Sequence, residues 1–212
     1  MEAIPAINCS TKECVQEKFT EIRGLGAVWA HVDITDGNFS STVTCNDVNE
    51  YKYSRLFLEI HLMVKNPELI IDEWLSIGAK RIIVHVESFI GRDDEVIREI
   101  STKCKKNGAE LMLSENPDTA VEELFAHAGA VDSFQLLAVN PGPSGQGFDE
   151  GTIGKIKKLR EKMPNSLIEV DGGITPDIAM RAMHAGADVV VSASYIFGSK
   201  DPQAAFNALK IL

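Results

Sequence analysis

The chain has 212 residues, of which 44% are hydrophobic and 25% are charged. This composition is typical of a globular protein and argues against extended disorder. With 21 basic and 31 acidic residues the net charge is −10, which makes the surface a poor electrostatic partner for nucleic acid or an anionic membrane.

Eight short apolar segments rich in β-formers recur along the chain and predict β-strands. In chain order they are residues 3–9, 27–34, 56–62, 81–87, 109–114, 133–139, 167–171 and 188–193. Their starts are about 26 residues apart on average, which is the length of one strand–helix repeat. Eight such units with no linker between them predict an α/β protein, a single (β/α)₈ TIM barrel over residues 1–212.

Helix signals lie between these segments. The stretch 93–109 begins with acidic residues, carries Lys and Arg late and stops at Gly108. Proline favours the first turn of a helix and predicts further helix starts at Pro67, Pro117, Pro176 and Pro202. The second unit differs, because the segment between Asp36 and Leu56 is short and polar. There we expect only a turn or two of helix, around residues 45–54.

The N-terminal segment MEAIPAINCS has neither a basic region nor a long apolar stretch, so it shows no secretory signal. No apolar run approaches the roughly 20 residues that a membrane-spanning helix needs. The cysteines at positions 9, 14, 45 and 104 form no CxxC pair. We therefore expect reduced, structural thiols and a cytoplasmic location.

Polar residues end three of the predicted strands. In a barrel the active site lies at the carboxyl ends of the strands. The second strand ends with His31 and Asp33, which share a face because they are two residues apart; the third ends with His61 and the seventh with Asp171. Two imidazoles and two carboxylates converging there predict a site for one divalent metal ion: Zn, Fe, Mn or Co. A cation would also offset the cost of burying two carboxylates.

Loops rich in Gly and Ser follow the last three strands. They read VNPGPSGQGF at 139–148, DGGIT after the seventh strand and SASYIFGS after the eighth. Glycines in any one loop could simply make a tight turn. Three consecutive loops of this kind favour a phosphate site instead, because they expose backbone N–H groups to an anion.

Together these motifs resemble the ribulose-phosphate 3-epimerase family over essentially the whole chain. HVDITDGNF, HLMVKNPE and HVES are similar to the family's motifs on strands 2, 3 and 4. ENPDT, VNPGPSGQGF and EVDGGIT are similar to those on strands 5, 6 and 7, in the same order. One such motif would be weak evidence, whereas six in register are specific. The resemblance implies a barrel of the ribulose-phosphate-binding type.

The resemblance also implies roles for individual residues. His31, Asp33, His61 and Asp171 would bind one divalent metal ion, and Asp33 and Asp171 would be the catalytic acid/base pair. This agrees with the chemistry, because inverting a carbon next to a carbonyl needs a proton removed on one face of the substrate and returned on the other. One carboxyl group on each face can do this, and the metal would stabilise the enediolate between the two steps. Substrate and phosphate would be bound by Met63, Gly142, Gly145, Gln146, Gly172, Gly173, Ala193 and Ser194.

The chain departs from the family pattern at several positions. Ala6 stands where the family usually has Ser, and Thr35 and Leu137 stand where it usually has Met, whereas Met63 is kept. The phosphate loop reads GPSGQ rather than GFGGQ. We expect these changes on the pocket walls, where they bear on the choice of substrate rather than on the type of reaction.

The leading hypothesis is epimerisation of D-ribulose 5-phosphate and D-xylulose 5-phosphate at C3, a step of the pentose phosphate pathway. Ala6 and Thr35 slightly favour an alternative, 3-epimerisation of another ketose phosphate such as allulose 6-phosphate. A second alternative is a non-catalytic sugar-phosphate-binding barrel, against which the two opposed carboxylates argue, because a binding protein has no need of them. A decarboxylase or aldolase usually needs a lysine at a strand end, and no predicted strand end has one. The expected partner is a small phosphorylated ketose, and a homo-oligomer is compatible with the sequence.

Overall fold

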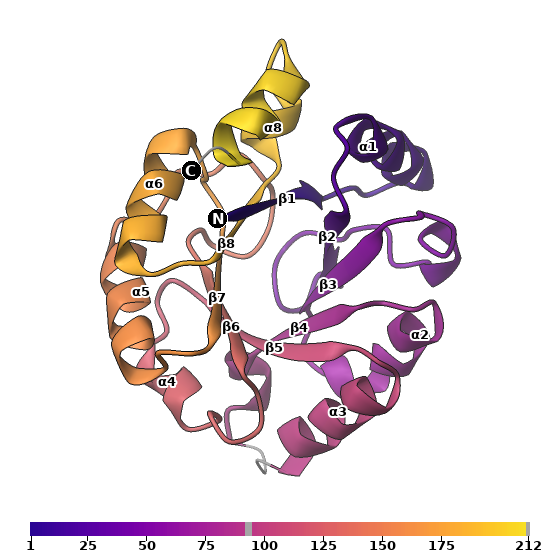
Figure 1. Ribbon diagram of the computed structural model, residues 1–212. Coiled ribbons are helices and arrows are strands. Elements are labelled where there is room, and N and C mark those ends of the chain that lie inside the picture. The colour runs from indigo at the N-terminus through magenta and orange to yellow at the C-terminus, as the bar shows by residue number, and fades with distance from the viewer. Residues whose placement is uncertain (92–94, 211–212) are drawn as a thin grey trace.

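A computed structural model describes residues 1–91 and 95–210. Eight parallel strands pair in chain order and close into a barrel, with β8 against β1 (Figure 1). The strands are β1 (Glu2–Ile7), β2 (Trp29–Thr35), β3 (Phe57–Met63), β4 (Arg81–His85), β5 (Glu110–Glu115), β6 (Ser133–Leu137), β7 (Leu167–Asp171) and β8 (Val189–Ser192). All eight predicted strands and the predicted fold are confirmed.

Helices surround the barrel (Figure 1). They are α1 (Lys12–Gly24), η1 (Val48–Glu50), η2 (Pro67–Leu69), α2 (Ile71–Ser76), η3 (Val86–Phe89), α3 (Glu95–Lys106), α4 (Glu122–Phe125), α5 (Gly151–Lys162), α6 (Pro176–Ala185), α7 (Ser194–Phe197) and α8 (Pro202–Lys210). The short helix expected in the second unit is η1. The predicted helix that stops before Gly108 is α3, and its expected acidic start at Asp93 and Asp94 lies outside the described residues. Within residues 1–91 and 95–210, no helix combines the length and apolarity needed to cross a membrane.

Three of the predicted proline starts are confirmed: helices begin at Pro67, Pro176 and Pro202. The fourth is wrong, because Pro117 lies in a turn and α4 begins only at Glu122. The ammonium group of Lys155 donates to the carbonyl oxygens of Pro117 and Thr119, at 2.6 Å each. These carbonyls are therefore held by a side chain of α5, which stabilises the turn in place of a helix.

The expectation of reduced thiols is wrong for Cys9 and Cys14, which form a disulfide bond with their Cα atoms 5.7 Å apart. Cys9 follows β1 and Cys14 lies in the first turn of α1, so the tight strand–helix connection brings them together without a CxxC motif. Thr11 closes this connection, because its side chain caps α1 by accepting from the backbone N–H of Cys14. Cys45 and Cys104 are free. A cytoplasmic location stays a prediction.

The barrel interior contains both apolar and polar side chains. An apolar cluster near β1 and β8 consists of Ile4, Ala6, Val189 and Val191. The rest of the interior includes buried polar side chains, among them Glu59, Arg81, Gln135 and Glu169. The main hydrophobic core lies between strands and helices. The barrel is therefore rigidly packed from outside, while its interior supports a polar site at the mouth.

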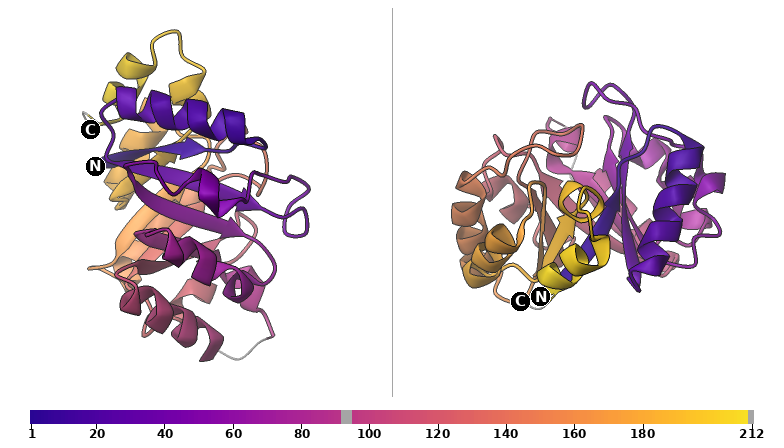
Figure 2. Two further views of the ribbon diagram at one scale, coloured as in Figure 1. Left: turned by 90° about the vertical axis from the view of Figure 1, so that its right-hand side faces the viewer. Right: turned by 90° about the horizontal axis from the view of Figure 1, so that it is seen from above.

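The loop after β2 projects beyond the carboxyl ends of the strands (Figure 2). It folds back on itself through a bridge between Asp36 and Val43. The Asp36 carboxylate accepts hydrogen bonds from the backbone N–H groups of Asn38 and Phe39, which shapes the turn. Further along, the Phe39 ring contacts the ring of His85 with centroids 4.8 Å apart, so the loop covers one edge of the mouth.

Candidate active site

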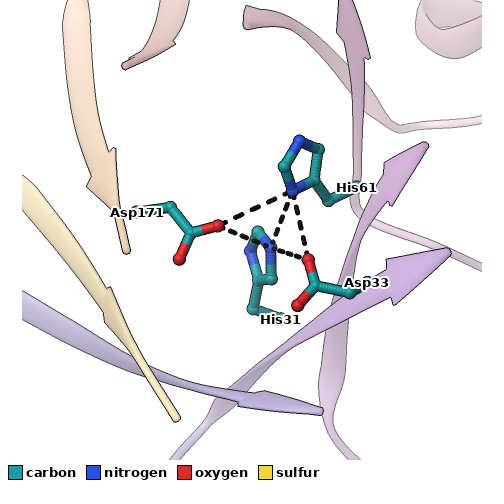
Figure 3. Close-up of side chains that lie close together, drawn as sticks. All are labelled: His31, Asp33, His61 and Asp171. Atoms are coloured by element: carbon teal, nitrogen blue, oxygen red, sulfur yellow. Dashed lines mark hydrogen bonds and ion pairs between the residues drawn. The ribbon is translucent and has the colours of Figure 1, made fainter. Parts of the chain in front are cut away.

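The four predicted metal-binding side chains meet at the mouth of the barrel (Figure 3). His31 and Asp33 both point inward from β2, as their two-residue spacing predicts. The register pairs Asp33 with His61 on β3. Asp171 reaches the same place from the end of β7. The two histidines are fully buried, whereas the side chains of the two aspartates are slightly exposed.

The separations of the four ligand atoms fit a small metal ion. Nε2 of His31 lies 3.3 Å from Nδ1 of His61, and both nitrogens are 3.2 Å from Oδ1 of Asp33. Both are 3.7 Å from Oδ2 of Asp171. A tetrahedral centre with bonds of about 2.0–2.2 Å has ligand–ligand edges of about 3.3–3.6 Å. The four atoms are therefore arranged as the ligands of one divalent cation would be.

The charge balance of the cluster also favours a cation. Burial alone would lower the pKa of His31, but its hydrogen bonds with Asp33 and Glu59 outweigh burial and raise the pKa well above the usual value. The pKa of its neighbour His61 is instead lowered to about 4, mainly by burial. The carboxylates thus attract one positive charge to this point. A metal ion would supply that charge in place of the imidazole proton.

The two carboxyl groups differ in their affinity for a proton. Burial opposes ionisation of Asp33, but hydrogen bonds with His31 and His61 hold its pKa well below the usual range. Burial raises the pKa of Asp171 to about 7; His31 opposes this rise and the charge of Asp33 adds to it. In the protein without a bound ion, one carboxyl group is therefore ionised near neutral pH and the other is close to its titration point. A pair with separated pKa values is typical of acid/base chemistry.

A chain of buried charges supports His31 from below. Its Nδ1 lies 2.8 Å from Oε1 of Glu59, and Nη1 of Arg81 donates to Oε2 of Glu59 at 2.6 Å. The same Nη1 is 3.4 Å from Glu169. Burial disfavours the charge on Glu59, but His31 and Arg81 lower its pKa. When a metal ion replaces the second imidazole proton, an ionised Glu59 would accept a hydrogen bond from the Nδ1–H of neutral His31 and so direct the Nε2 lone pair at the cluster.

A second chain supports His61 from the other side. Its Nε2 is 2.8 Å from Nε2 of His85, whose Nδ1 is 3.2 Å from Oε2 of Glu87. The other oxygen of Glu87 accepts from the backbone N–H of Asn116, and also from the hydroxyl of Thr119. The orientation of His61 thus depends on the loop after β5, and its Nδ1 is left facing the cluster.

A pocket at the mouth brings together the residues predicted to bind substrate. It is lined by both carboxylates and by Met63, Gly142, Gly145, Gln146, Gly172, Gly173, Ala193 and Ser194. Of the positions that depart from the family pattern, Ala6 and Leu137 also line it. The expectation for Thr35 is wrong: this side chain is fully buried and lies outside the pocket, because the loop residue Thr42 contacts its hydroxyl at 3.4 Å.

The predicted phosphate loops offer N–H groups rather than charged side chains. The lining residues include no Lys or Arg. The short helix α7 begins at Ser194, and Ala193 before it has no side chain that can cap the helix. Gln146 also lines the pocket, but its amide nitrogen donates to the carbonyl oxygens of Asn140 and Pro143 and so stabilises the loop after β6. An anion in this pocket would be bound by backbone groups.

Sequence reasoning missed Glu59, His85 and Asn8, each of which contacts one of the four predicted ligands directly. Glu59 stands two residues before His61 on the same strand, and this spacing could have identified it. His85 lies within the HVES segment, which carried no chemical role. Asn8 lies just beyond β1 and hydrogen-bonds to Asp33. The only feature of the sequence that could have identified it is its position as a polar residue at a strand end.

Comparisons with known proteins identify the family of this chain. A model of the ribulose-phosphate 3 epimerase family matches residues 3–197. The ribulose-phosphate 3-epimerase of Aquifex aeolicus (strain VF5) is 37% identical over 221 residues, covering 98% of this chain and 95% of that protein. A cytoplasmic isoform of ribulose-phosphate 3-epimerase from Oryza sativa subsp. japonica is 36% identical over 194 residues, covering 88% of this chain and 82% of that protein.

Solved structures show the same fold at low sequence identity. KGPDC from Streptococcus mutans, solved in complex with D-R5P, has a TM-score of 0.76 at 12% identity, covering 99% of this chain and 95% of that one. A 3-hexulose-6-phosphate synthase has a TM-score of 0.73 at 16% identity, covering 100% and 99%. These likenesses support the barrel architecture alone.

Proposed function

The chain belongs to the ribulose-phosphate 3-epimerase family, and on that premise we propose that it interconverts D-ribulose 5-phosphate and D-xylulose 5-phosphate by inverting C3. The observation that carries this proposal is the pair Asp33 and Asp171. Their carboxyl groups come from β2 and β7 and both line the mouth pocket, whereas the two histidines are fully buried and are not among its lining residues. A bound ketose phosphate would meet one carboxyl group on each side.

The reaction needs one ionised and one protonated carboxyl group at the start. For one epimer, Asp33 as carboxylate removes the C3 proton, and Asp171 as carboxylic acid returns a proton to the opposite face of the enediolate. For the other epimer the roles are exchanged, and each turnover leaves the pair ready for the reverse reaction. The position of both carboxyl groups on the pocket wall supports this assignment.

His31 and His61 complete the ligand set with the two carboxylates, and the short separations support a bound divalent ion. When bound, a divalent cation would stabilise the negative charge that develops on the ketose oxygens. The protein's own part is to hold the four ligands: Glu59 orients His31 and His85 orients His61. This support keeps the geometry rigid while a proton moves at C3.

The direct experiment is an assay of the purified protein with D-ribulose 5-phosphate, with xylulose 5-phosphate measured as the product. Allulose 6-phosphate, run in parallel, tests the alternative substrate that Ala6 and Leu137 on the pocket wall leave open. We expect the pentulose phosphate to give the higher kcat/KM. No conversion of either ketose would contradict the proposed function, and preference for the hexulose would reassign the substrate.

Gly173 tests the phosphate site. Its φ is +67°, and an added Cβ would lie 2.5 Å from the backbone nitrogen of Phe148 and 2.7 Å from its Cα. Gly173→Ala would therefore displace the loop after β6. We expect KM for the phosphorylated ketose to rise more than about tenfold, and far more than KM for free pentulose. Only the phosphorylated ketose has a phosphate group for the loop to bind.

The matched control is Gly147→Ala, one residue before Phe148, where an added Cβ meets nothing within 4 Å and φ needs no glycine. It should leave KM for the phosphorylated ketose within about twofold of the wild type, as for a surface change without strain. Equal effects of Gly173→Ala on phosphorylated and free ketose would place the anion elsewhere.

A further inference from the structure

Asn8 connects one of the two carboxylates to the mouth loop. It follows the last residue of β1, is half-buried and lines the pocket. Its amide nitrogen donates to Oδ2 of Asp33 at 3.0 Å and to the carbonyl oxygen of Gly142 at 3.1 Å. Gly142 is 134 residues away in sequence. One side chain thus links the ends of β1 and β2 and the loop after β6.

These two acceptors determine how the amide is oriented. An amide nitrogen has two hydrogens, and here each has an acceptor. Rotating the amide by 180° would place its oxygen against the Asp33 carboxylate and the Gly142 carbonyl, where both contacts would be repulsive. Because Gly142 contributes a backbone oxygen, its hydrogen bond with Asn8 depends on the course of the loop and not on a side chain. The position of Asn8 Nδ2 is therefore well defined.

Asn8 binds the oxygen of Asp33 that the histidines do not. Oδ1 of Asp33 faces both His31 and His61, whereas Oδ2 faces Asn8. Oδ2 is therefore the atom left to exchange a proton with the ketose. A carboxylate oxygen has two lone-pair directions, and Asn8 occupies one of them on Oδ2. The other remains for the substrate proton, in a direction that the Asn8 hydrogen bond sets.

The inward side chain of β1 closest to Asn8 cannot supply this contact. Ala6 is the inward residue two positions before Asn8, pairs with His31 in the register and also lines the pocket. It has no polar group. Within the described residues, the hydrogen-bond contacts of Asp33 Oδ1 come from histidines, and Asn8 is the donor to Oδ2.

We propose that Asn8 is a positioning residue that fixes the torsion of the Asp33 carboxylate, so that Oδ2 points at the C3 proton of the bound ketose. This inference rests on the proposed function. It assigns Asn8 to one half of the reaction, because Asn8 contacts Asp33 and makes no hydrogen bond to Asp171.

The test compares Asn8→Leu with the wild type. Leucine has the shape of asparagine but donates no hydrogen bond. We expect kcat to fall about tenfold or more, because a small misplacement of a reacting group is costly. KM should change less than about threefold, and the metal content should stay the same because Oδ1 still faces the histidines. Asn207→Leu, the same change on an exposed residue of α8, controls for general effects on the protein and should match the wild type.

A second comparison tests whether Asn8 acts through Asp33. Adding Asn8→Leu to Asp171→Asn should slow the remaining deuterium exchange at C3, whereas adding it to Asp33→Asn should not slow it further. A kcat of Asn8→Leu within twofold of the wild type would overturn the inference, as would a raised KM with unchanged kcat, or equal slowing in both backgrounds. An inactive wild-type protein would instead contradict the proposed function itself.

Discussion

Changing either Asp33 or Asp171 to Asn should lower the rate of epimerisation by at least about 10², because each change removes one partner of the proton transfer while keeping the size of the side chain. Both carboxyl groups line the mouth pocket, and their pKa values lie far apart in the protein without a bound ion. Inversion requires both groups. Loss of either one should therefore stop turnover without preventing the ketose from binding.

Hydrogen exchange in D₂O separates the two halves of the reaction. In Asp171→Asn, Asp33 can still remove a proton from one epimer and return deuterium to the same face. That epimer becomes labelled without inversion, and Asp33→Asn should label the opposite epimer. The measurement is mass spectrometry of the recovered ketose phosphates. Metal content is determined in parallel, because both residues belong to the candidate metal-binding cluster.

Asp36→Asn is the matched control for this pair. Its carboxylate lies just after β2 but binds the backbone of its own turn and does not line the pocket. It should epimerise within about twofold of the wild-type rate, as expected for a change outside the reacting centre. If both active-site variants label the same epimer, or if either epimerises at the wild-type rate, the two-base assignment is wrong.

Replacing His61 with Ala should remove most of the bound metal and nearly all activity. The wild type should contain about one divalent ion per chain, the stoichiometry of a site with four converging ligands. His61 contributes the Nδ1 atom that lies 3.2 Å from Asp33 and 3.3 Å from His31. Without it, two carboxylates and one imidazole remain, and a water molecule would have to complete the set. Elemental analysis after gel filtration measures the occupancy.

Two further variants test which residues determine the affinity for the metal ion. Glu59→Gln keeps the size of the group next to His31 but removes its charge, so metal affinity should fall about 10- to 100-fold in a metal-buffered titration. His184→Ala makes the same change as His61→Ala on the exposed side of α6 and should retain the full metal content. Full occupancy in His61→Ala would contradict the ligand assignment. Chelator should abolish wild-type activity, and added metal should restore it.

Much of this architecture could be predicted from local patterns in the sequence. Apolar segments at regular spacing indicated eight strands because each strand must be buried between barrel interior and helices, and all eight are present. The spacing of His31 and Asp33 placed them on one face because strand side chains alternate with period two. His61 and Asp171 followed from their positions at strand ends, since parallel strands in a barrel all end at the same mouth.

The supporting contacts could not be predicted, because they join atoms that are distant in sequence. The hydrogen bond of Glu59 to His31 depends on the register between β2 and β3, and the bond of Asn8 to Gly142 depends on where two loops cross the mouth. The Cys9–Cys14 disulfide joins residues only 5 apart in sequence, but it depends on how tightly α1 turns away from β1. Periodicity determines which face a side chain occupies, but only the stagger of the strands and the course of the loops determine which partner it meets there.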